Sequence, residues 1–294
     1  MGEGDRGSAV RGRLRGIEVF AGPLAEFDPE RAPADPVPLL LSWLSDAVAD
    51  GVRDHRRAGT SPVSAHKARQ HRMTTPTRTP YGGGAIGSLR AGHSPHRRPD
   101  ERIARLVAEA LDDARTVLDV GAVAADLPFG DGEFDASMTL FGVHRWSDVP
   151  AGLREMRRVT RGPVVILTCD PAVVRDFWLY RYAPEVLDIE ALRHPTVEEL
   201  ASALGGSGTV RTVPIPLDCT GGFDEAYYGR PETLLDPAAR QAGSAWSFVD
   251  DRVREHFDTT LRADLESGAW DEEFGHLRSR PTYEGSLVIV RAAP

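Results

Sequence analysis

Apolar residues recur from residue 99 onward in two patterns, one typical of helices and one typical of buried strands. In DERIARLVAEALDD, Ile103, Leu106, Val107 and Leu111 recur at the spacing of one helix face, and Asp100 is placed to cap the helix. Short apolar runs such as TVLDVGA are typical of strands buried on both faces. We expect helices at 100–113, 151–160, 171–187, 196–206 and 250–268, and strands at 116–122, 134–144, 162–170, 209–219 and 285–292. Strands that alternate with helices predict an α/β fold with a largely parallel sheet.

The first third of the chain is organised differently. After Pro36, apolar residues at three- and four-residue spacing predict one amphipathic helix that ends near Gly51. Residues 52–72 then hold six basic residues, one acidic residue and three histidines, and the stretch stays polar and Gly-rich to about residue 95. The expected organisation is an N-terminal fragment over 1–51, a disordered basic and Gly-rich linker over 52–95, and a folded domain over 96–294 with an aromatic cap at about 219–284.

Charge and composition narrow the classes of partner. The 294 residues carry a formal net charge of −9, which argues against general affinity for nucleic acid or an anionic membrane. No apolar run is long enough to span a bilayer, and no secretory signal follows Met1. The two cysteines, Cys169 and Cys219, exclude a disulfide framework and suit a reducing compartment. We therefore expect a cytoplasmic protein.

Four motifs follow one another in a fixed order: HRRPDERIARLVAEAL, TVLDVGA, ADLPFGDGEFDASMTLFGVHRW and GLREMRRVTRGPVVILTCDP. Through them, residues 95–292 resemble the class I S-adenosylmethionine-dependent methyltransferases that act on small molecules. The resemblance implies an incomplete Rossmann-like methyltransferase sheet, mostly parallel with an antiparallel C-terminal strand. It also implies S-adenosylmethionine as the cofactor and a small organic molecule as the methyl acceptor.

The resemblance assigns the cofactor contacts residue by residue. Glycines after the first strand let the backbone approach the ligand closely, at the end of VLDVGA. The LPF loop flanks the adenine in this family, and the segment before the first helix closes over the cofactor. The expected cofactor-binding residues are Asp119, Gly121, Ala122, Leu127, Pro128 and Arg98. A solvated charge run remains the alternative for Arg98.

Substrate-facing residues are expected beyond the next strand and in the cap. His144 is the candidate general base, with a packing or capping histidine as the alternative. Trp146, Tyr228 and Trp246 are the candidate substrate contacts, and core packing is the alternative for the cap aromatics. An aromatic cap favours a small organic acceptor over nucleic acid or protein. No metal site is expected from the spacing of His, Cys and acidic residues.

The sequence departs from the family after Ala122. Only 14 residues, from Gly121 to Phe134, join two strands that the family pairs in parallel, and roughly 35–40 residues are missing. An irregular loop can just make this link, and an edge hairpin is the alternative. The carboxylate that would hold the ribose has no counterpart, so we expect cofactor affinity lowered by roughly two to four orders of magnitude. The first strand should become a sheet edge, which would favour a homo-oligomer.

A weaker resemblance covers the first 50 residues. The stretch IEVFAGPLAEFDPERAPADPVPLLLSWLSDAVADGV is similar to the start of pyridoxamine-phosphate oxidases, but no site residue carries over and no flavin is expected. A gene start joined to a methyltransferase gene that begins at Met73 is one hypothesis. A methyltransferase-family enzyme is the leading interpretation. A non-catalytic remnant retained for binding or dimerisation is the second, and an oxidase-related protein is the third.

Overall fold

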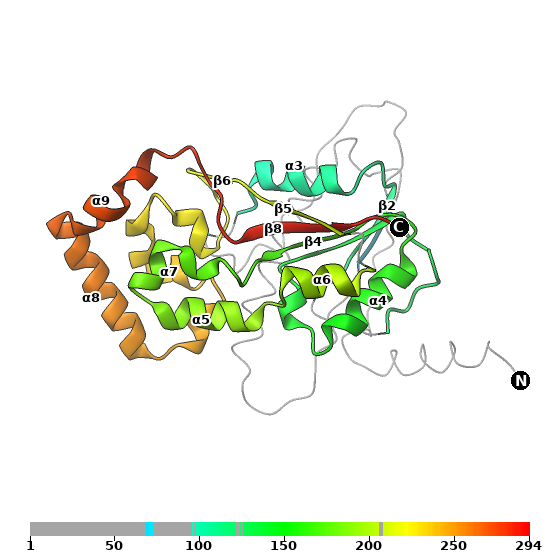
Figure 1. Ribbon diagram of the computed structural model, residues 1–294, viewed down its shortest axis with the longest axis horizontal. Coiled ribbons are helices and arrows are strands. Elements are labelled where there is room, and N and C mark those ends of the chain that lie inside the picture. Colours follow the sequence, from blue (N-terminus) through cyan, green and yellow to red (C-terminus); the bar gives the residue numbers. More distant parts are fainter. Residues whose placement is uncertain (1–68, 73–95, 97, 122–123, 125, 206–207) are drawn as a thin grey trace, which may run out of the picture.

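The computed structural model describes residues 69–72, 96, 98–121, 124, 126–205 and 208–294 (Figure 1). The predicted N-terminal fragment, with its amphipathic helix, lies outside the described residues. So does most of the predicted linker. Cofactor candidate Ala122 also falls outside them.

One mixed sheet organises the described part of the chain. Its strands lie in the order β1-β2-β3-β4-β8-β5, and β2, β3 and β4 are mutually parallel. The C-terminal strand β8 runs antiparallel to both β4 and β5, which confirms the expected antiparallel C-terminal strand in a Rossmann-like sheet. The strands are β1 (Arg69–Arg72), β2 (Thr116–Asp119), β3 (Ala136–Leu140), β4 (Val164–Cys169), β5 (Gly208–Thr212) and β8 (Leu287–Ala292).

Strand β1 corrects two expectations. Residues 69–72 were expected in a disordered linker, yet they pair antiparallel with β2, Arg69 opposite Asp119 and Arg72 opposite Thr116. Strand β1 rather than β2 therefore forms the edge of the sheet. The sequence RQHR offers no apolar alternation, and the pairing depends on backbone groups that any residue supplies.

The short link between β2 and β3 joins two parallel strands. Val117 lies opposite Ala136, and Asp119 opposite Met138, so the alternative of an edge hairpin is wrong. The described part of the link, 120–121, 124 and 126–135, contains no helix. Asp135 fastens its end, because its Oδ2 accepts hydrogen bonds from the backbone N–H groups of Arg115 and Thr116 at 3.0 and 2.9 Å.

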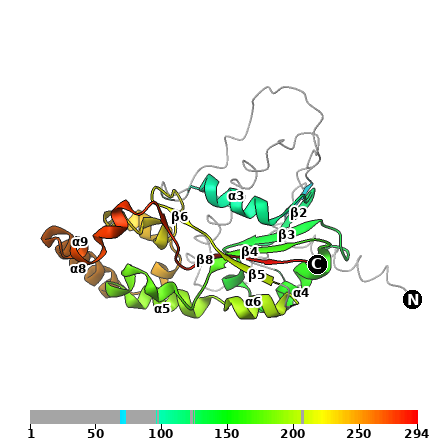
Figure 2. The same cartoon turned by 45° about the horizontal axis from the view of Figure 1, so that its top comes forward.

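Helices cover both faces of the sheet. Helix α3 (Glu101–Ala110) lies on one face, and α4 (Val149–Val159) and α6 (Val197–Ala203) lie on the other (Figures 1 and 2). Asp100 caps α3 as predicted, and its side chain accepts from Arg102 N. Thr196 and Glu199 form a reciprocal capping box at the start of α6. None of the described helices is both long and apolar enough to cross a membrane.

The stretch 171–187 differs from the single helix expected there. It contains two 3₁₀ turns, η5 (Val174–Asp176) and η6 (Trp178–Arg181), and the start of α5 (Pro184–Arg193). Phe177 has an extended backbone between the two turns. Pro184 begins α5 because proline fits the first turn of a helix but not its interior.

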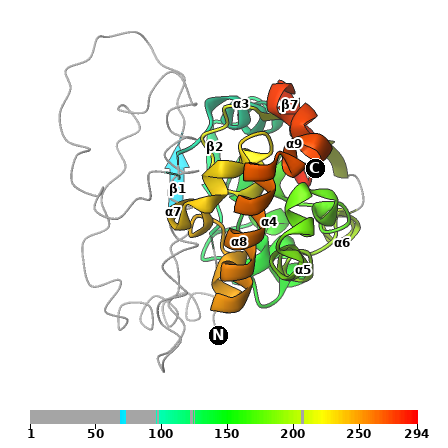
Figure 3. The same cartoon turned by 90° about the vertical axis from the view of Figure 1, so that its left-hand side faces the viewer.

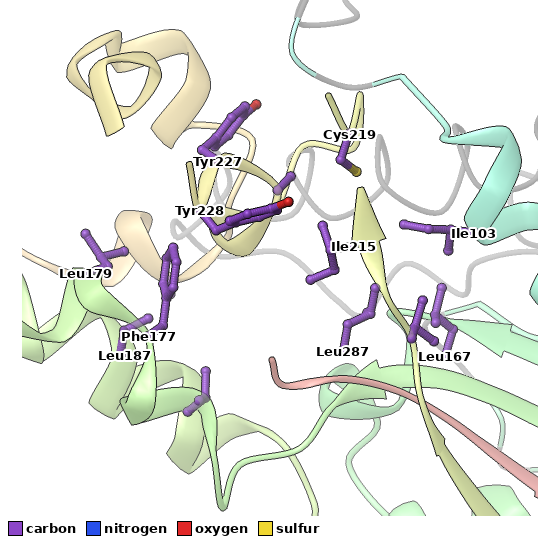
Figure 4. Close-up of a cluster of buried hydrophobic side chains, with 14 of the residues drawn as sticks. Ile103, Leu167, Phe177, Leu179, Leu187, Ile215, Cys219, Tyr227, Tyr228 and Leu287 are labelled. Carbon is purple, nitrogen blue, oxygen red and sulfur yellow. The ribbon is translucent and has the colours of Figure 1, made fainter. Parts of the chain in front are cut away.

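Alternating side chains of the strands divide the core in two. Val117 and Met138 face the α3 side, in a cluster that also contains Ile103 and Val107. Leu118 belongs to the other cluster, with buried residues of α4 and α6. The α3-side cluster continues into the C-terminal part of the chain, where Tyr227 and Tyr228 lie among aliphatic side chains that include Ile215 and Leu287 (Figure 4).

Residues 217–286 form a cap at the edge of the sheet where β2, β3 and β4 end, here called the carboxyl edge. Cys169, the last residue of β4, lies opposite Leu287, at which the chain leaves the cap and enters β8. Figure 3 shows the molecule from the cap side. The cap contains η7 (Asp224–Tyr227), η8 (Pro231–Leu235), α7 (Pro237–Arg240), η9 (Ala245–Phe248), α8 (Asp251–Ser267), α9 (Ala269–Phe274) and η10 (Gly275–Ser279). The short strands β6 (Ile215–Pro216) and β7 (Thr282–Tyr283), from opposite ends of this region, pair antiparallel at its base.

Candidate functional site at the carboxyl edge

The ends of β2 and β3 meet closely at the carboxyl edge. A Cβ on Gly142 would lie 2.3 Å from Thr139 Oγ1, 3.3 Å from Gly121 O and 3.4 Å from Val120 O. A side chain there would clash with the Thr139 hydroxyl and crowd both carbonyl oxygens, so glycine suits this crossing best. By contrast, a Cβ on Gly121 would meet nothing within 4 Å, so the backbone at Gly121 is open to an approaching ligand. A glycine turn at a cofactor site needs both features: one glycine that allows close packing of the strand ends, and one whose backbone a ligand can approach.

Trp146 joins the two strand ends. Its indole Nε1 donates a hydrogen bond of 2.6 Å to the carbonyl oxygen of Gly121. The ring packs against α4 so tightly that a Cβ on Gly152 would lie 2.6 Å from it and 2.7 Å from Ala124 Cβ. Trp146 is only 8% exposed and supports the glycine turn from inside the protein. Its role as a substrate contact stays a prediction.

Arg158 of α4 holds the loop that carries the adenine candidates. Its guanidinium donates to Leu127 O at 3.1 Å and to Phe129 O at 2.9 Å. Glu155 accepts from Arg158 and also from Leu127 N at 2.9 Å. Leu127 is buried and Pro128 is exposed, so Leu127 offers a fixed apolar side chain and Pro128 a solvent-facing one.

Backbone strain marks the same edge. Phe141 has φ +51° directly after β3, and Asp126 has φ +60° in the link. Left-handed backbone is unfavourable for a bulky residue such as Phe, and residues held this way concentrate at functional sites. The Phe141 ring faces Phe223 of the cap, with ring centroids 6.0 Å apart. The strained residue therefore stands between the glycine crossing and the cap.

His144 lies on the turn after β3, as expected from the sequence. Burial and the neighbouring His194 lower the pKa of His144 to about 3, so the imidazole is neutral at ordinary pH. Its Nδ1 is buried with no hydrogen-bond partner among the described residues. The ring centroids of His144 and His194 are 4.5 Å apart. A neutral imidazole with a vacant nitrogen can accept a proton or bind a cation, and the role as general base stays a prediction.

A second group of titratable side chains surrounds the end of β4, and the sequence reasoning missed it. Cys169, Glu190 and His194 place one sulfur, one oxygen and one nitrogen atom within 4.8 Å of one another. Glu190 and His194 lie four residues apart on α5, which is the spacing of one helix face and was the available signal. Cys169 is distant in sequence, so only the fold brings it to the pair.

Buried carboxyl groups of the cap line the same region. Burial raises the pKa of Asp224 to about 7, even though Trp246 Nε1 donates to its Oδ1 at 3.0 Å. Burial also raises the pKa of Glu225 to about 7, while its oxygens accept from Ser286 N. Both carboxyl groups act electrostatically on Cys169. The end of β4 is therefore a buried region with an excess of acidic groups.

The remaining residues predicted to contact ligand differ in exposure: Tyr228 and Trp246 are buried, and Arg98 is exposed. Tyr228 is 0% exposed, stacks on Tyr283 with ring centroids 5.1 Å apart, and donates its hydroxyl to Arg280 O. Trp246 is 3% exposed and packs edge-on against Phe257. Arg98 is exposed, and its backbone N–H donates to Thr220 O at 3.2 Å. Their roles in binding stay predictions.

The described residues fit S-adenosylmethionine in part. The open backbone at Gly121, the close crossing at Gly142 and the fixed Leu127 suit a nucleoside cofactor at the ends of β2 and β3. Strand β2 lies between β3 and β1, and the sequence of β1, RQHR, contains no acidic residue. Among the described residues of that edge, a carboxylate for the ribose hydroxyls is therefore missing.

Residues 101–166 match the family model of the methyltransferase domain. This stretch, which is similar to that family, is here called the methyltransferase-domain segment. It includes β2, β3, α4 and most of β4, and with them the open backbone at Gly121 and the crossing at Gly142. The match thus covers every cofactor candidate except Arg98, which precedes it.

Known proteins are similar to this segment over short stretches. A demethylmenaquinone methyltransferase of Mycolicibacterium vanbaalenii is 47% identical over 57 residues, which are 19% of this chain and 25% of the relative. The uncharacterized protein YafE of Escherichia coli is 36% identical over 74 residues, 24% of this chain and 32% of the relative. The chain thus spans about a quarter to a third of the length of these relatives.

The fold extends beyond the methyltransferase-domain segment. A solved structure of a putative methyltransferase from an antibiotic biosynthesis pathway of Anabaena variabilis superposes with a TM-score of 0.54 at 25% identity. The superposition covers 57% of this chain and 70% of that one. The Rossmann-like methyltransferase fold is therefore present in this chain, as the motif order predicted.

Proposed function

We propose that the chain is an S-adenosylmethionine-dependent methyltransferase that acts on a small molecule. The supporting observation is the glycine crossing: the methyltransferase-domain segment ends β2 at an open Gly121 and crosses it with Gly142, where no Cβ fits. Bound S-adenosylmethionine supplies an electrophilic methyl group on its sulfonium sulfur. The part of the chain itself is to hold the cofactor and the acceptor in line and to exclude water.

Different residues of the carboxyl edge serve cofactor binding and proton transfer. Gly121 and Asp119 present the end of β2 to the cofactor, and Leu127, held by Arg158, provides an apolar wall for adenine. His144 follows β3 and is the candidate to take a proton from an acceptor hydroxyl or amine, although its low pKa makes it a weak base in the free chain. The buried aromatic cap supports a small acceptor.

The missing ribose carboxylate sets the expected affinity. Two lost charge-assisted hydrogen bonds weaken binding by roughly two to four orders of magnitude. We therefore propose a weak cofactor site, with a Kd for S-adenosylhomocysteine above about 10 μM.

Calorimetric titration of the full chain with S-adenosylhomocysteine tests the proposal. We expect saturable binding to one site, weakened at least about tenfold by Gly121→Ala, because the added methyl group fills the open approach without touching the protein. Gly275→Ala is the matched control, since it adds the same methyl group in η10 at ordinary contact distance from Asp271. Absence of binding up to about 1 mM, or equal binding by the Gly121→Ala variant, overturns the proposal.

A further inference from the structure

The cluster at the end of β4 has the composition of a transition-metal site. Cys169 offers a thiol, Glu190 a carboxylate and His194 an imidazole, and these are the three ligand types that zinc prefers. Among the residues that the structure describes, they form the one group of three or more such side chains with this spacing. They come from two elements, β4 and α5, whose packing fixes their approach.

The spacing of the donor atoms is close to that of a bound ion. Zinc bonds of about 2.0–2.3 Å in a tetrahedron separate neighbouring ligand atoms by about 3.3–3.8 Å. The Nε2 of His194 and the Oε1 of Glu190 already lie 3.1 Å apart. All three donors lie within 4.8 Å of one another, which is about one ångström more than the spacing around a bound zinc ion.

Two buried polar atoms at this cluster lack hydrogen-bond partners among the residues that the structure describes. They are the Oε2 of Glu190, from which Arg193 Nη1 is 3.8 Å away, and the Nδ1 of the adjacent His144. Unpaired buried polar atoms are rare in native proteins, and a bound ion or water is the usual explanation. A carboxylate oxygen in this position is one that a cation can bind.

Thr168 can support both the empty and the loaded state. Its Oγ1 lies 3.0 Å from Nδ1 of His194, and the residue is fully buried. Without a metal, the hydroxyl donates to Nδ1 while Nε2–H donates to Glu190. With a metal on Nε2, Nδ1–H donates to the hydroxyl instead, which is the usual outer-shell arrangement of a metal-bound histidine.

We propose that Cys169, Glu190 and His194 form a binding site for a divalent transition-metal ion of the zinc class at the carboxyl end of β4. Three protein ligands leave the fourth position of a tetrahedral ion for water or for a lone pair of a substrate. Binding releases the thiol proton of Cys169 to solvent, while the ring proton of His194 moves from Nε2 to Nδ1 and stays on the ring. The site lies beside the proposed cofactor edge and does not depend on the cofactor.

The test is titration of the full chain with zinc chloride, after chelator treatment and with a reductant that keeps both thiols free. Histidines of residues 52–96 also offer imidazoles, so stoichiometry alone does not identify the site. Cys169→Ser decides, because it keeps the size of the side chain and removes the soft ligand. Cys219→Ser is the matched control, since Cys219 is the other cysteine of the chain and lies outside the cluster.

We expect one tight site that Cys169→Ser weakens by about 100-fold or more and Cys219→Ser leaves unchanged. Cobalt(II) provides a readout that needs no variant, because a thiolate ligand adds an intense near-ultraviolet charge-transfer band. That band should appear in the wild-type chain and in Cys219→Ser, and be absent in Cys169→Ser. Equal zinc affinity of the wild-type and Cys169→Ser chains, or a cobalt complex of the wild type without the band, overturns the proposal.

Discussion

The indole Nε1 of Trp146 and the carbonyl oxygen of Gly121 are joined by a hydrogen bond of 2.6 Å. Trp146 follows β3 and Gly121 follows β2, so the bond locks the ends of two parallel strands that only a short link connects. This side chain therefore helps to set where the glycine turn stands relative to Gly142. The geometry of the cofactor edge therefore depends on a residue that was expected to touch substrate.

Trp146→Phe should loosen this edge. The substitution leaves the Gly121 carbonyl without its donor and removes part of the buried ring, which should cost about 2–3 kcal/mol in the free energy of unfolding. Because the turn is then free to shift, affinity for S-adenosylhomocysteine should also fall at least about fivefold. Urea unfolding and calorimetry measure the two effects.

Trp178→Phe is the matched control for this variant. The Trp178 indole also donates to a backbone carbonyl, that of Tyr228 at 3.0 Å, but it does so within the cap core. A comparable loss of stability with unchanged ligand affinity is expected. If both variants lose affinity equally, the effect of Trp146 is one of general stability, and the bond to Gly121 has no special role.

Arg158→Gln should release the loop that carries Leu127. The guanidinium bonds two loop carbonyls and pairs with Glu155 and Asp131, so its loss should cost about 1–3 kcal/mol. Arg105→Gln removes an exposed pair with Glu101 one helical turn away and should change stability by less than about 0.5 kcal/mol. Thermal denaturation compares them. Proteolysis within 126–133 should accelerate only in Arg158→Gln, and equal digestion rates would contradict the assignment.

Sequence patterns were sufficient for the elements that depend on local apolar spacing. Helix α3 with its Asp100 cap, and the strands β2, β3, β4 and β8, follow from periodicity and from the order of the motifs. The run 171–187 shows the limit of this reasoning. Its apolar residues fit a helix, yet the aromatic rings of Phe177 and Trp178 pack on each other and on the cap, and the backbone bends to allow it.

Features built from distant residues were not predictable in this way. Strand β1 has the polar sequence RQHR, and its pairing with β2 uses backbone atoms alone. The group of Cys169, Glu190 and His194 spans two elements, and only the last two residues share a local spacing. The cofactor candidates were accessible because the glycine turn is contiguous in sequence, whereas only the fold brings His194, at the end of α5, next to His144.

Asp224→Asn should stabilise the chain in a manner that depends on pH. Burial raises the pKa of Asp224 to about 7 in the folded chain, above its ordinary value of 3.8. The folded state therefore retains this proton more strongly than the unfolded state, and stability from this group is complete below pH 4 and is lost as pH rises toward 7. The amide carries no charge and still accepts from Trp246 Nε1.

Urea unfolding at several pH values, with a chelator present, measures this effect. The stability of the variant relative to wild type should rise between pH 4 and pH 7 and then stay constant, by about 1–3 kcal/mol in total. A difference between the two chains that does not change over this range would mean that Asp224 is ionised without cost. The buried acidic excess at the end of β4 would then be smaller than proposed.

Thr168→Val tests whether the hydroxyl beside His194 orients that ring for a metal. Valine keeps the shape of the side chain and removes the oxygen that lies 3.0 Å from Nδ1. Zinc affinity should fall about 10-fold, as it does when an outer-shell partner of a ligand is lost.

Thr139→Val is the matched control. Thr139 is equally buried, on the adjacent strand β3, and its hydroxyl has no hydrogen-bond partner among the described residues. That variant should keep its zinc affinity and lose no stability. Equal zinc affinity in both variants would mean that His194 is held in place by Glu190 alone, and the orienting role of Thr168 would be wrong even if the metal site stands.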